Sequence, residues 1–228
     1  MDKNILSLFQ LCDSNFPTGA FSHSFGLESY IQDNQVTDQE TFYRWLQVYL
    51  HEQLIYTDGL ACSLVYEALS NENYERIWEL DRLLMVQNLP RETREGTQMI
   101  GSRMLKMAES LFGLPILTKY SEEIKKKNLS GHPSIVFSMV AHGLGVTKSN
   151  TLLYYLYSAI SSLVQNGVRA IPLGQTAGQT IIHQFMSELT KAVEKILTLT
   201  EDDFGIVSPG LELSQMKHER VNIRIFMS

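Results

Sequence analysis

Apolar residues recurring at helical spacing constrain the fold of this chain more than any other feature. The clearest stripe comprises Phe42, Trp45, Leu46, Tyr49, Leu50 and Leu54. These residues lie on one face of a helix for more than three turns. Thr37 and Glu40 precede the stripe with the spacing of a capping box, which predicts that the helix begins with Thr37 as its N-cap.

Six further stretches carry the same period, at residues 60–69, 74–85, 99–112, 133–143, 149–165 and 176–197. Pro90, Gly113 and Pro115 end two of them, and Asn166-Gly167 is expected to separate the last two. The only strand-like alternation is Val221, Ile223 and Ile225. The pattern predicts an all-α protein, a single globular helical bundle of roughly seven to nine helices. We place the helical domain at residues 1–200 and an extended C-terminal tail at residues 201–228.

Charge is unevenly distributed along the chain. With 19 Lys and Arg against 25 Asp and Glu, the formal net charge is −6, which argues against a nucleic-acid partner. From residue 149 to 187 the only formally charged residue is Arg169. Polar residues interrupt this stretch too often for a membrane span. It is therefore expected to form a buried helix pair, at the centre of the bundle or in an oligomer interface.

Arg169 needs a role of its own, because an unpaired buried guanidinium is costly. An ion pair within the subunit and an anchor in a protein interface are both open. We favour the interface, since Arg169 follows the expected break at Asn166-Gly167 and residues at helix junctions are more often exposed.

The sequence lacks the motifs of common enzymes. It has no phosphate-binding loop and no nucleophile elbow, and His218-Glu219 begins a zinc-protease motif that Asn222 ends. Cys12 could be a thiol nucleophile, but a buried inert cysteine is the commoner case. Cys12 and Cys62 cannot form a disulfide framework, and no signal peptide precedes them, so we expect a cytoplasmic protein. We expect no catalytic residue and no stably bound cofactor.

Two segments carry unusual residues. In residues 13–28, Phe16, Phe21 and Phe25 alternate with small polar residues and glycines around Pro17-Thr18-Gly19. This segment could be a corner whose aromatic rings fill the core, or a rigid loop that presents His23 and Glu28 to a partner.

The second segment is the tail from Ser208 onward. Its apolar residues are Leu211, Leu213, Met216, Val221, Ile223, Ile225, Phe226 and Met227. Unattached termini are usually polar, so these side chains need a surface to cover them. Docking on the chain's own domain and docking on another protein are both open, and we favour the second.

These two segments, together with residues 169–179, resemble the urease accessory protein F family. The resemblance covers both ends and the middle of the chain, with the three signatures in the family's order. Ala20 departs from the glycine often found at that position, and Asn15 from a small residue.

The resemblance implies a homodimeric, all-helical scaffold without catalytic activity. Such a protein bridges a D/H-type accessory protein and a nickel-carrying G-type GTPase during nickel insertion into apo-urease, and nickel is handled only transiently within the complex. The residues that the resemblance assigns to docking of the tail on the D/H-type partner are His218, Glu219, Arg220 and Arg224. Those assigned to the assembly surfaces are Phe21, His23, Phe25, Glu28, Tyr157, Arg169, Gln175 and Gln179. The alternative is a soluble carrier that holds Ni²⁺ itself through His23, His218 and nearby carboxylates, although the sequence does not define the nickel ligands.

Overall fold

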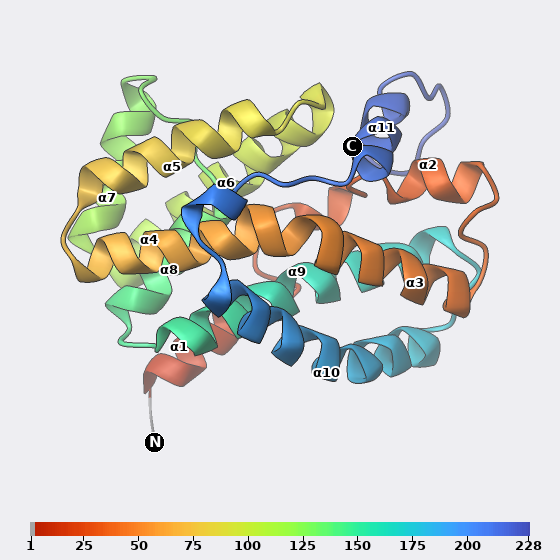
Figure 1. The fold of residues 1–228 in the computed structure, drawn as a ribbon, viewed down its shortest axis with the longest axis horizontal. Coiled ribbons are helices and arrows are strands. Elements are labelled where there is room, and N and C mark those ends of the chain that lie inside the picture. The colour runs from red at the N-terminus through yellow and green to blue at the C-terminus, as the bar shows by residue number, and fades with distance from the viewer. Residues whose placement is uncertain (1–2) are drawn as a thin grey trace.

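The computed structural model describes residues 3–228, and within this range it contains helices and no strand (Figure 1). The α-helices are α1 (Lys3–Cys12), α2 (Leu27–Gln32), α3 (Gln39–Tyr49), α4 (Leu60–Ser70), α5 (Tyr74–Gln87), α6 (Arg91–Phe112), α7 (Pro115–Lys125), α8 (Pro133–Gly143), α9 (Lys148–Ala170), α10 (Gln175–Thr198) and α11 (Pro209–His218). The predicted all-α fold is confirmed, with slightly more helices than the expected number.

A continuous helical rod runs from α3 through a π-helical segment, Leu50–Gly59, into α4. Its start differs from the prediction by one residue. The N-cap is Asp38, whose side chain accepts a hydrogen bond from the backbone N–H of Thr41 at 2.9 Å. The Thr41 hydroxyl in turn accepts from the Asp38 N–H at 3.1 Å. These two hydrogen bonds satisfy two otherwise free backbone N–H donors at the start of the helix. The capping box is therefore formed by Asp38 and Thr41 and not, as predicted, by Thr37 and Glu40.

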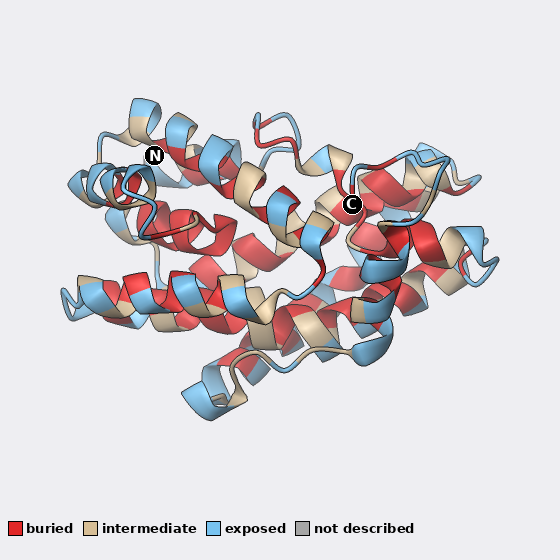
Figure 2. Ribbon diagram, turned by 90° about the horizontal axis from the view of Figure 1, so that it is seen from above, coloured by how far each residue is buried: buried red, intermediate tan, exposed pale blue. Residues whose placement is uncertain are grey.

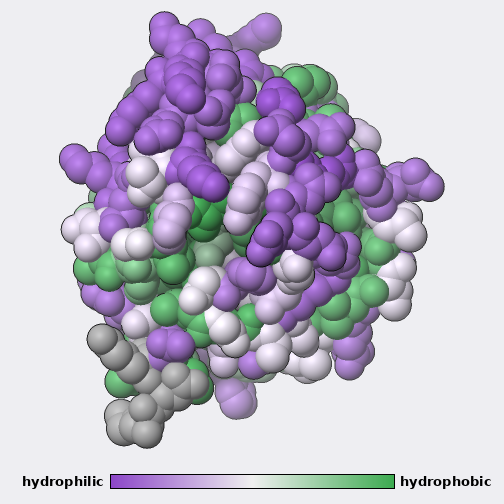
Figure 3. All heavy atoms as spheres, turned by 90° about the vertical axis from the view of Figure 1, so that its left-hand side faces the viewer, coloured by the Kyte–Doolittle hydropathy of each residue, from purple (hydrophilic) through white to green (hydrophobic). Residues whose placement is uncertain are grey.

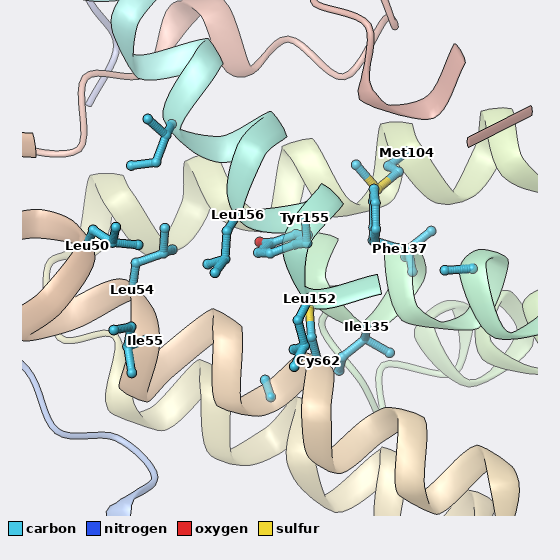
Figure 4. Packing of buried hydrophobic residues seen from close by; sticks show 14 of the residues in the cluster. Leu50, Leu54, Ile55, Cys62, Met104, Ile135, Phe137, Leu152, Tyr155 and Leu156 are labelled. Carbon is cyan, nitrogen blue, oxygen red and sulfur yellow. The ribbon is translucent and has the colours of Figure 1, made fainter. Parts of the chain in front are cut away.

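The core lies where this rod packs on α8 and α9 and where α6 packs on α8, and Figure 4 shows buried side chains from all of these elements. Residues 133–141 of α8 are buried all round, which makes α8 the central helix. Most other helices have one buried and one exposed face, as the alternating colours of Figure 2 show. One large cluster of buried apolar side chains therefore holds the bundle together.

The charge-poor pair is α9 and α10, which pack against each other. The expected break at Asn166-Gly167 is wrong, since α9 continues to Ala170. A Cβ on Gly167 would collide with the ring of Phe42, so glycine is needed there for close helix packing. The Asn166 amide donates to the backbone oxygen of His23 at 2.8 Å. Tertiary contacts therefore override the turn preference of this dipeptide.

The tail returns to its own domain. Helix α11 packs against α2 and α6, with Leu211 and Phe226 buried, and the end of the chain lies beside α2 and α11 (Figure 1). Residues 221–225 form no strand, and the backbone bends at residues 222, 223 and 225. Of the two docking possibilities for the tail, the structure shows packing on its own chain. Glu28 and Glu92 bind the tail there through hydrogen bonds.

Among residues 3–228, no helix combines the length and the apolar character that a membrane crossing requires. At the end of the bundle where α4 passes into α5, hydrophilic side chains cover much of the surface, interrupted by smaller apolar areas (Figure 3).

Candidate functional site

Segments far apart in the sequence meet at one place, which we call the tail–loop site. It comprises the loop 13–28, the first turns of α6, the end of α9 at residues 166–169, and residues 208–228. Nine of the residues assigned to partner binding on the resemblance lie in these segments: Phe21, His23, Phe25, Glu28, Arg169, His218, Glu219, Arg220 and Arg224.

Unusual backbone angles shape the loop. Gly19 and Gly26 have φ values of 82° and 90°, and Phe25 has a φ of 53°, which is uncommon for a residue with a side chain. The ring of His23 packs on the backbone of α6, where a Cβ on Gly96 would lie 2.6 Å from it. The loop therefore turns sharply at both glycines and packs on α6 through His23.

The three phenylalanines of the loop serve two purposes. Phe16 is buried and Phe25 packs against the core, as expected of a corner that fills the core. Phe21, on the 3-10 turn Ala20–Ser22, remains 58% exposed. Phe16 and Phe25 therefore fit the core-filling interpretation. The alternative, in which the loop presents His23 and Glu28 to a partner, is wrong for these two side chains, which are only 2% and 3% exposed.

Glu28 is a buried carboxylate that binds the tail. One oxygen accepts from the N–H of Ile225 at 2.6 Å. The other accepts from the N–H of Phe226 at 3.0 Å and lies 2.9 Å from His218 Nε2. Because Glu28 is only 3% exposed, these groups replace the water that a carboxylate otherwise binds.

Glu92, in the first turn of α6, is the second anchor of the tail. Both of its oxygens accept from Arg224 Nη1 at 2.8 Å, and one lies 3.2 Å from His218 Nδ1. These bonds hold the pKa of Glu92 below its usual value, against the effect of partial burial. Glu219 caps the same helix by accepting from the N–H of Arg91 at 2.8 Å. The imidazole of His218 thus lies fully buried between two carboxylates.

Arg169 is exposed, and its hydrogen-bond partners are not carboxylates. Its guanidinium donates to the backbone oxygen of Phe21 and to the Asn166 side chain at 3.0 Å. It also lies over two aromatic rings, 5.7 Å from the centroid of Phe21 and 5.2 Å from that of Phe226. Of the two sequence alternatives, the buried ion pair is wrong, and the interface anchor stays a prediction.

The last residues of the chain pair with the loop. Ser24 N–H donates to the Ser228 oxygen at 2.5 Å, and Met227 N–H donates to the Ser22 oxygen at 2.8 Å. Ser228 Oγ lies 2.7 Å from His23 Nδ1. Burial, together with the charge of Arg103, lowers the pKa of His23, so this imidazole is neutral at physiological pH.

This arrangement leaves alternate apolar side chains of the tail pointing away from the domain. Phe226 is buried, whereas Ile223, Ile225 and Met227 are exposed at 89%, 63% and 57%. Exposed apolar side chains grouped on a short segment are typical of a docking surface.

The remaining predicted residues lie apart from these contacts or face solvent. Tyr157 is half-buried against the core, and Gln175 and Gln179 are exposed at the start of α10. Arg220 belongs to the tail and is exposed. The sequence analysis missed Glu92, Asn166, Phe226 and Arg103 as members of the site. Each of these four residues contacts a residue roughly 80 to 200 positions away in the sequence, so no local sequence pattern could have identified it.

Two observations concern the thiol and metal-ligand possibilities raised by the sequence. Cys12 lines a cavity of about 170 Å³ beside the loop, and burial raises its pKa to about 12, so it stays a thiol rather than a nucleophilic thiolate. Within residues 3–228, no three His, Cys, Asp or Glu side chains are grouped so that they could hold a metal ion. What the tail–loop site presents is a rigid surface of aromatic, aliphatic and arginine side chains.

Comparison with known proteins agrees with the resemblance. The family model described as UreF matches residues 36–186. A protein of Lachnoclostridium phytofermentans named "Urease accessory protein UreF" is 52% identical over 228 residues, which covers 100% of both chains. The family model spans the middle of the bundle, whereas the alignment with this relative also includes the loop and the tail.

Proposed function

The chain belongs to the UreF family of urease accessory proteins, and we propose that within urease maturation it is a non-catalytic scaffold. In this proposal it bridges a D/H-type accessory protein and a nickel-carrying G-type GTPase in the cytoplasm, so that nickel reaches apo-urease. The observation that carries the proposal is the tail–loop site, where four segments distant in the sequence build one surface of aromatic, aliphatic and arginine side chains.

The tail supports docking on the D/H-type partner. Its inward contacts, through Glu28 and Glu92, fix the backbone of residues 218–228. Its outward residues Ile223, Ile225 and Met227 remain uncovered. A fixed segment loses little conformational entropy on binding, so its apolar side chains can contribute fully to affinity.

Helix α10 supports a homodimer. Its buried face packs on α9, while its first three turns expose Gln175, Thr176, Gln179, Thr180, His183, Gln184, Met186 and Ser187. This exposed surface has no formal charge, and depletion of charge is typical of the centre of a protein interface.

The donor atoms of the histidines favour a scaffold over a nickel carrier. Both ring nitrogens of His218 face carboxylates, and His23 Nδ1 faces Ser228. A metal ion bound to these nitrogens would have to replace the contacts of His218 with Glu28 and Glu92, or that of His23 with Ser228, and these contacts hold the tail on the domain. Nickel is therefore cargo that the complex handles transiently, without resident ligands on this chain. Calorimetry with Ni²⁺ tests the alternative: micromolar, stoichiometric binding that is lost in His23→Ala would favour the carrier.

Co-purification with the other urease accessory proteins tests the scaffold. The wild-type chain should form a stable complex, and Ile223→Asp with Ile225→Asp should lose the D/H-type protein while keeping its fold. Val86→Asp is the matched control, because Val86 is an apolar residue exposed at 73% outside the tail–loop site. Equal recovery of the partner with both variants would contradict docking through the tail.

A further inference from the structure

Two arginines from different helices lie against the same short turn. Arg103 of α6 lies so close to Gly19 that a Cβ at that position would overlap its guanidinium. Arg169 of α9 donates to the backbone oxygen of Phe21, two residues further along the chain. Both arginines are exposed, as is Phe21 between them in the sequence.

Neither guanidinium is neutralised by a carboxylate within the described part of the chain. Arg103 makes no ion pair there, and its charge acts instead on His23. The partners of Arg169 are an uncharged carbonyl oxygen and an uncharged amide oxygen. Asp13, the acidic residue at the start of the loop, is engaged with Asn15 through hydrogen bonds of 2.7 and 2.8 Å. Positive charge is thus concentrated at this turn, although the chain as a whole carries −6.

We propose that the turn Ala20–Ser22, flanked by Arg103 and Arg169, binds an acidic segment of a partner protein. Carboxylates of that segment would pair with the two guanidinium groups, and an adjacent apolar side chain would pack on Phe21. Arginine suits this role because its planar fork binds a carboxylate through two parallel hydrogen bonds. Stacking on Phe21 and Phe226 also holds the Arg169 fork in place before the partner arrives.

The chemistry favours a protein over a phosphate polymer as the occupant. A chain with net charge −6 repels an extended polyanion, whereas two arginines beside an exposed aromatic ring match a short acidic and apolar peptide surface. Aromatic residues and arginines are the residue types that contribute most to protein interfaces. This inference rests on the proposed scaffold function and specifies the chemistry of one of its partners.

The test is the affinity for the D/H-type and the G-type accessory proteins, measured separately and together at low and high salt. Arg103→Gln is the cleaner variant, since Arg103 makes no hydrogen bond within residues 3–228 that supports the fold. It should weaken one of these complexes by about tenfold or more and reduce the dependence of the affinity on salt. Arg103→Lys, which keeps the charge, should recover part of the affinity. Arg169→Gln should weaken the same complex.

Arg82→Gln is the matched control, because Arg82 is an exposed arginine of α5 outside the tail–loop site. Its complexes should have wild-type affinity. If the wild-type chain assembles while Arg103→Gln and Arg169→Gln bind as tightly as Arg82→Gln, the acidic-segment proposal is overturned and the scaffold function stands. The proposal is also overturned if Phe21→Ala weakens binding while Arg103→Gln and Arg169→Gln do not. The partner would then recognise the aromatic ring and not the two guanidinium groups. A wild-type chain that binds neither accessory protein contradicts the scaffold function itself.

Discussion

At the scale of single residues, Glu28 decides whether the tail stays on the domain. Glu28→Gln keeps the size of the side chain but removes its charge, so the donors from His218, Ile225 and Phe226 lose a strong acceptor. We expect the free energy of unfolding to fall by about 2–3 kcal/mol, and the amides of the last residues to exchange faster with solvent. Urea denaturation and hydrogen exchange measure the two effects. Glu194→Gln, at an exposed position of α10, should change stability by less than about 0.5 kcal/mol, and similar values for both variants would contradict this role of Glu28.

Two buried histidines should make the fold sensitive to mild acid. Burial lowers the pKa of His23 and of His132, and the charge of Arg103 adds to the effect on His23. In the unfolded chain these imidazoles take up a proton near pH 6.5, whereas in the folded chain they do so only at lower pH. Below about pH 6.5 the unfolded state therefore binds more protons, and the free energy of unfolding falls as the pH falls.

Urea midpoints at about pH 8 and pH 5.5 measure this dependence above the range in which carboxylates titrate. His132→Asn should show a smaller drop in stability between these values, because asparagine can still cap α8 as His132 does, through the N–H of Ser134. His183→Asn, at an exposed position, should behave as the wild type. A His132→Asn protein with the full wild-type drop would show that His132 does not contribute.

At the scale of elements, Asn166-Gly167 continues α9 instead of ending it. Gly167→Ala would place a Cβ 3.0 Å from Phe42 Cε2 and closer still to two other ring atoms. The buried ring must then shift, and we expect a loss of about 1–3 kcal/mol in thermal or urea unfolding. Gly210→Ala in α11 is the control, since its Cβ would make an ordinary contact of 3.4 Å with Tyr30 Oη. There we expect no loss, or a gain of up to about 1 kcal/mol. Equal losses at the two glycines would mean that contact with Phe42 is unimportant.

Sequence reasoning succeeded for elements whose signal is local. Apolar periodicity predicted α5 and α10 within a few residues, and the stretch 133–143 coincides with α8. It failed where a distant partner decides. The alternation of Val221, Ile223 and Ile225 indicated a strand, but the structure forms none there, and the buried carboxylate of Glu28 binds the backbone N–H of Ile225 instead.

The residues of the candidate site were likewise predictable only where the signal is local. The aromatic residues and glycines of the loop and the apolar residues of the tail singled out both segments, and the resemblance supplied Arg224 and His218 as members. Glu92 and Arg103 were missed because they lie in an ordinary helical pattern on α6. Only the folded chain brings them to the tail and to the turn at Gly19.

At the scale of the whole molecule, a two-fold dimer through α10 would hold two tail–loop sites in one rigid scaffold. In such an interface the same surface meets itself, so a charge introduced on it faces its own copy. Gln179 and His183 lie one helical turn apart on the exposed, uncharged face. The double variant Gln179→Arg, His183→Arg should therefore separate the subunits while leaving the bundle folded, because neither side chain is buried.

Sedimentation over a range of concentrations measures this outcome. The wild-type protein should show about twice the mass of the 26.0 kDa chain, and the double variant the mass of one chain. Glu194→Arg changes an exposed residue of the same helix beyond its uncharged turns, and it should remain dimeric. Loss of the dimer in the double variant should also weaken assembly with the accessory proteins, since two linked sites bind more tightly than one. A double variant that sediments like the wild-type dimer would show that α10 does not form the interface. The uncharged face would then have to be explained by a different partner.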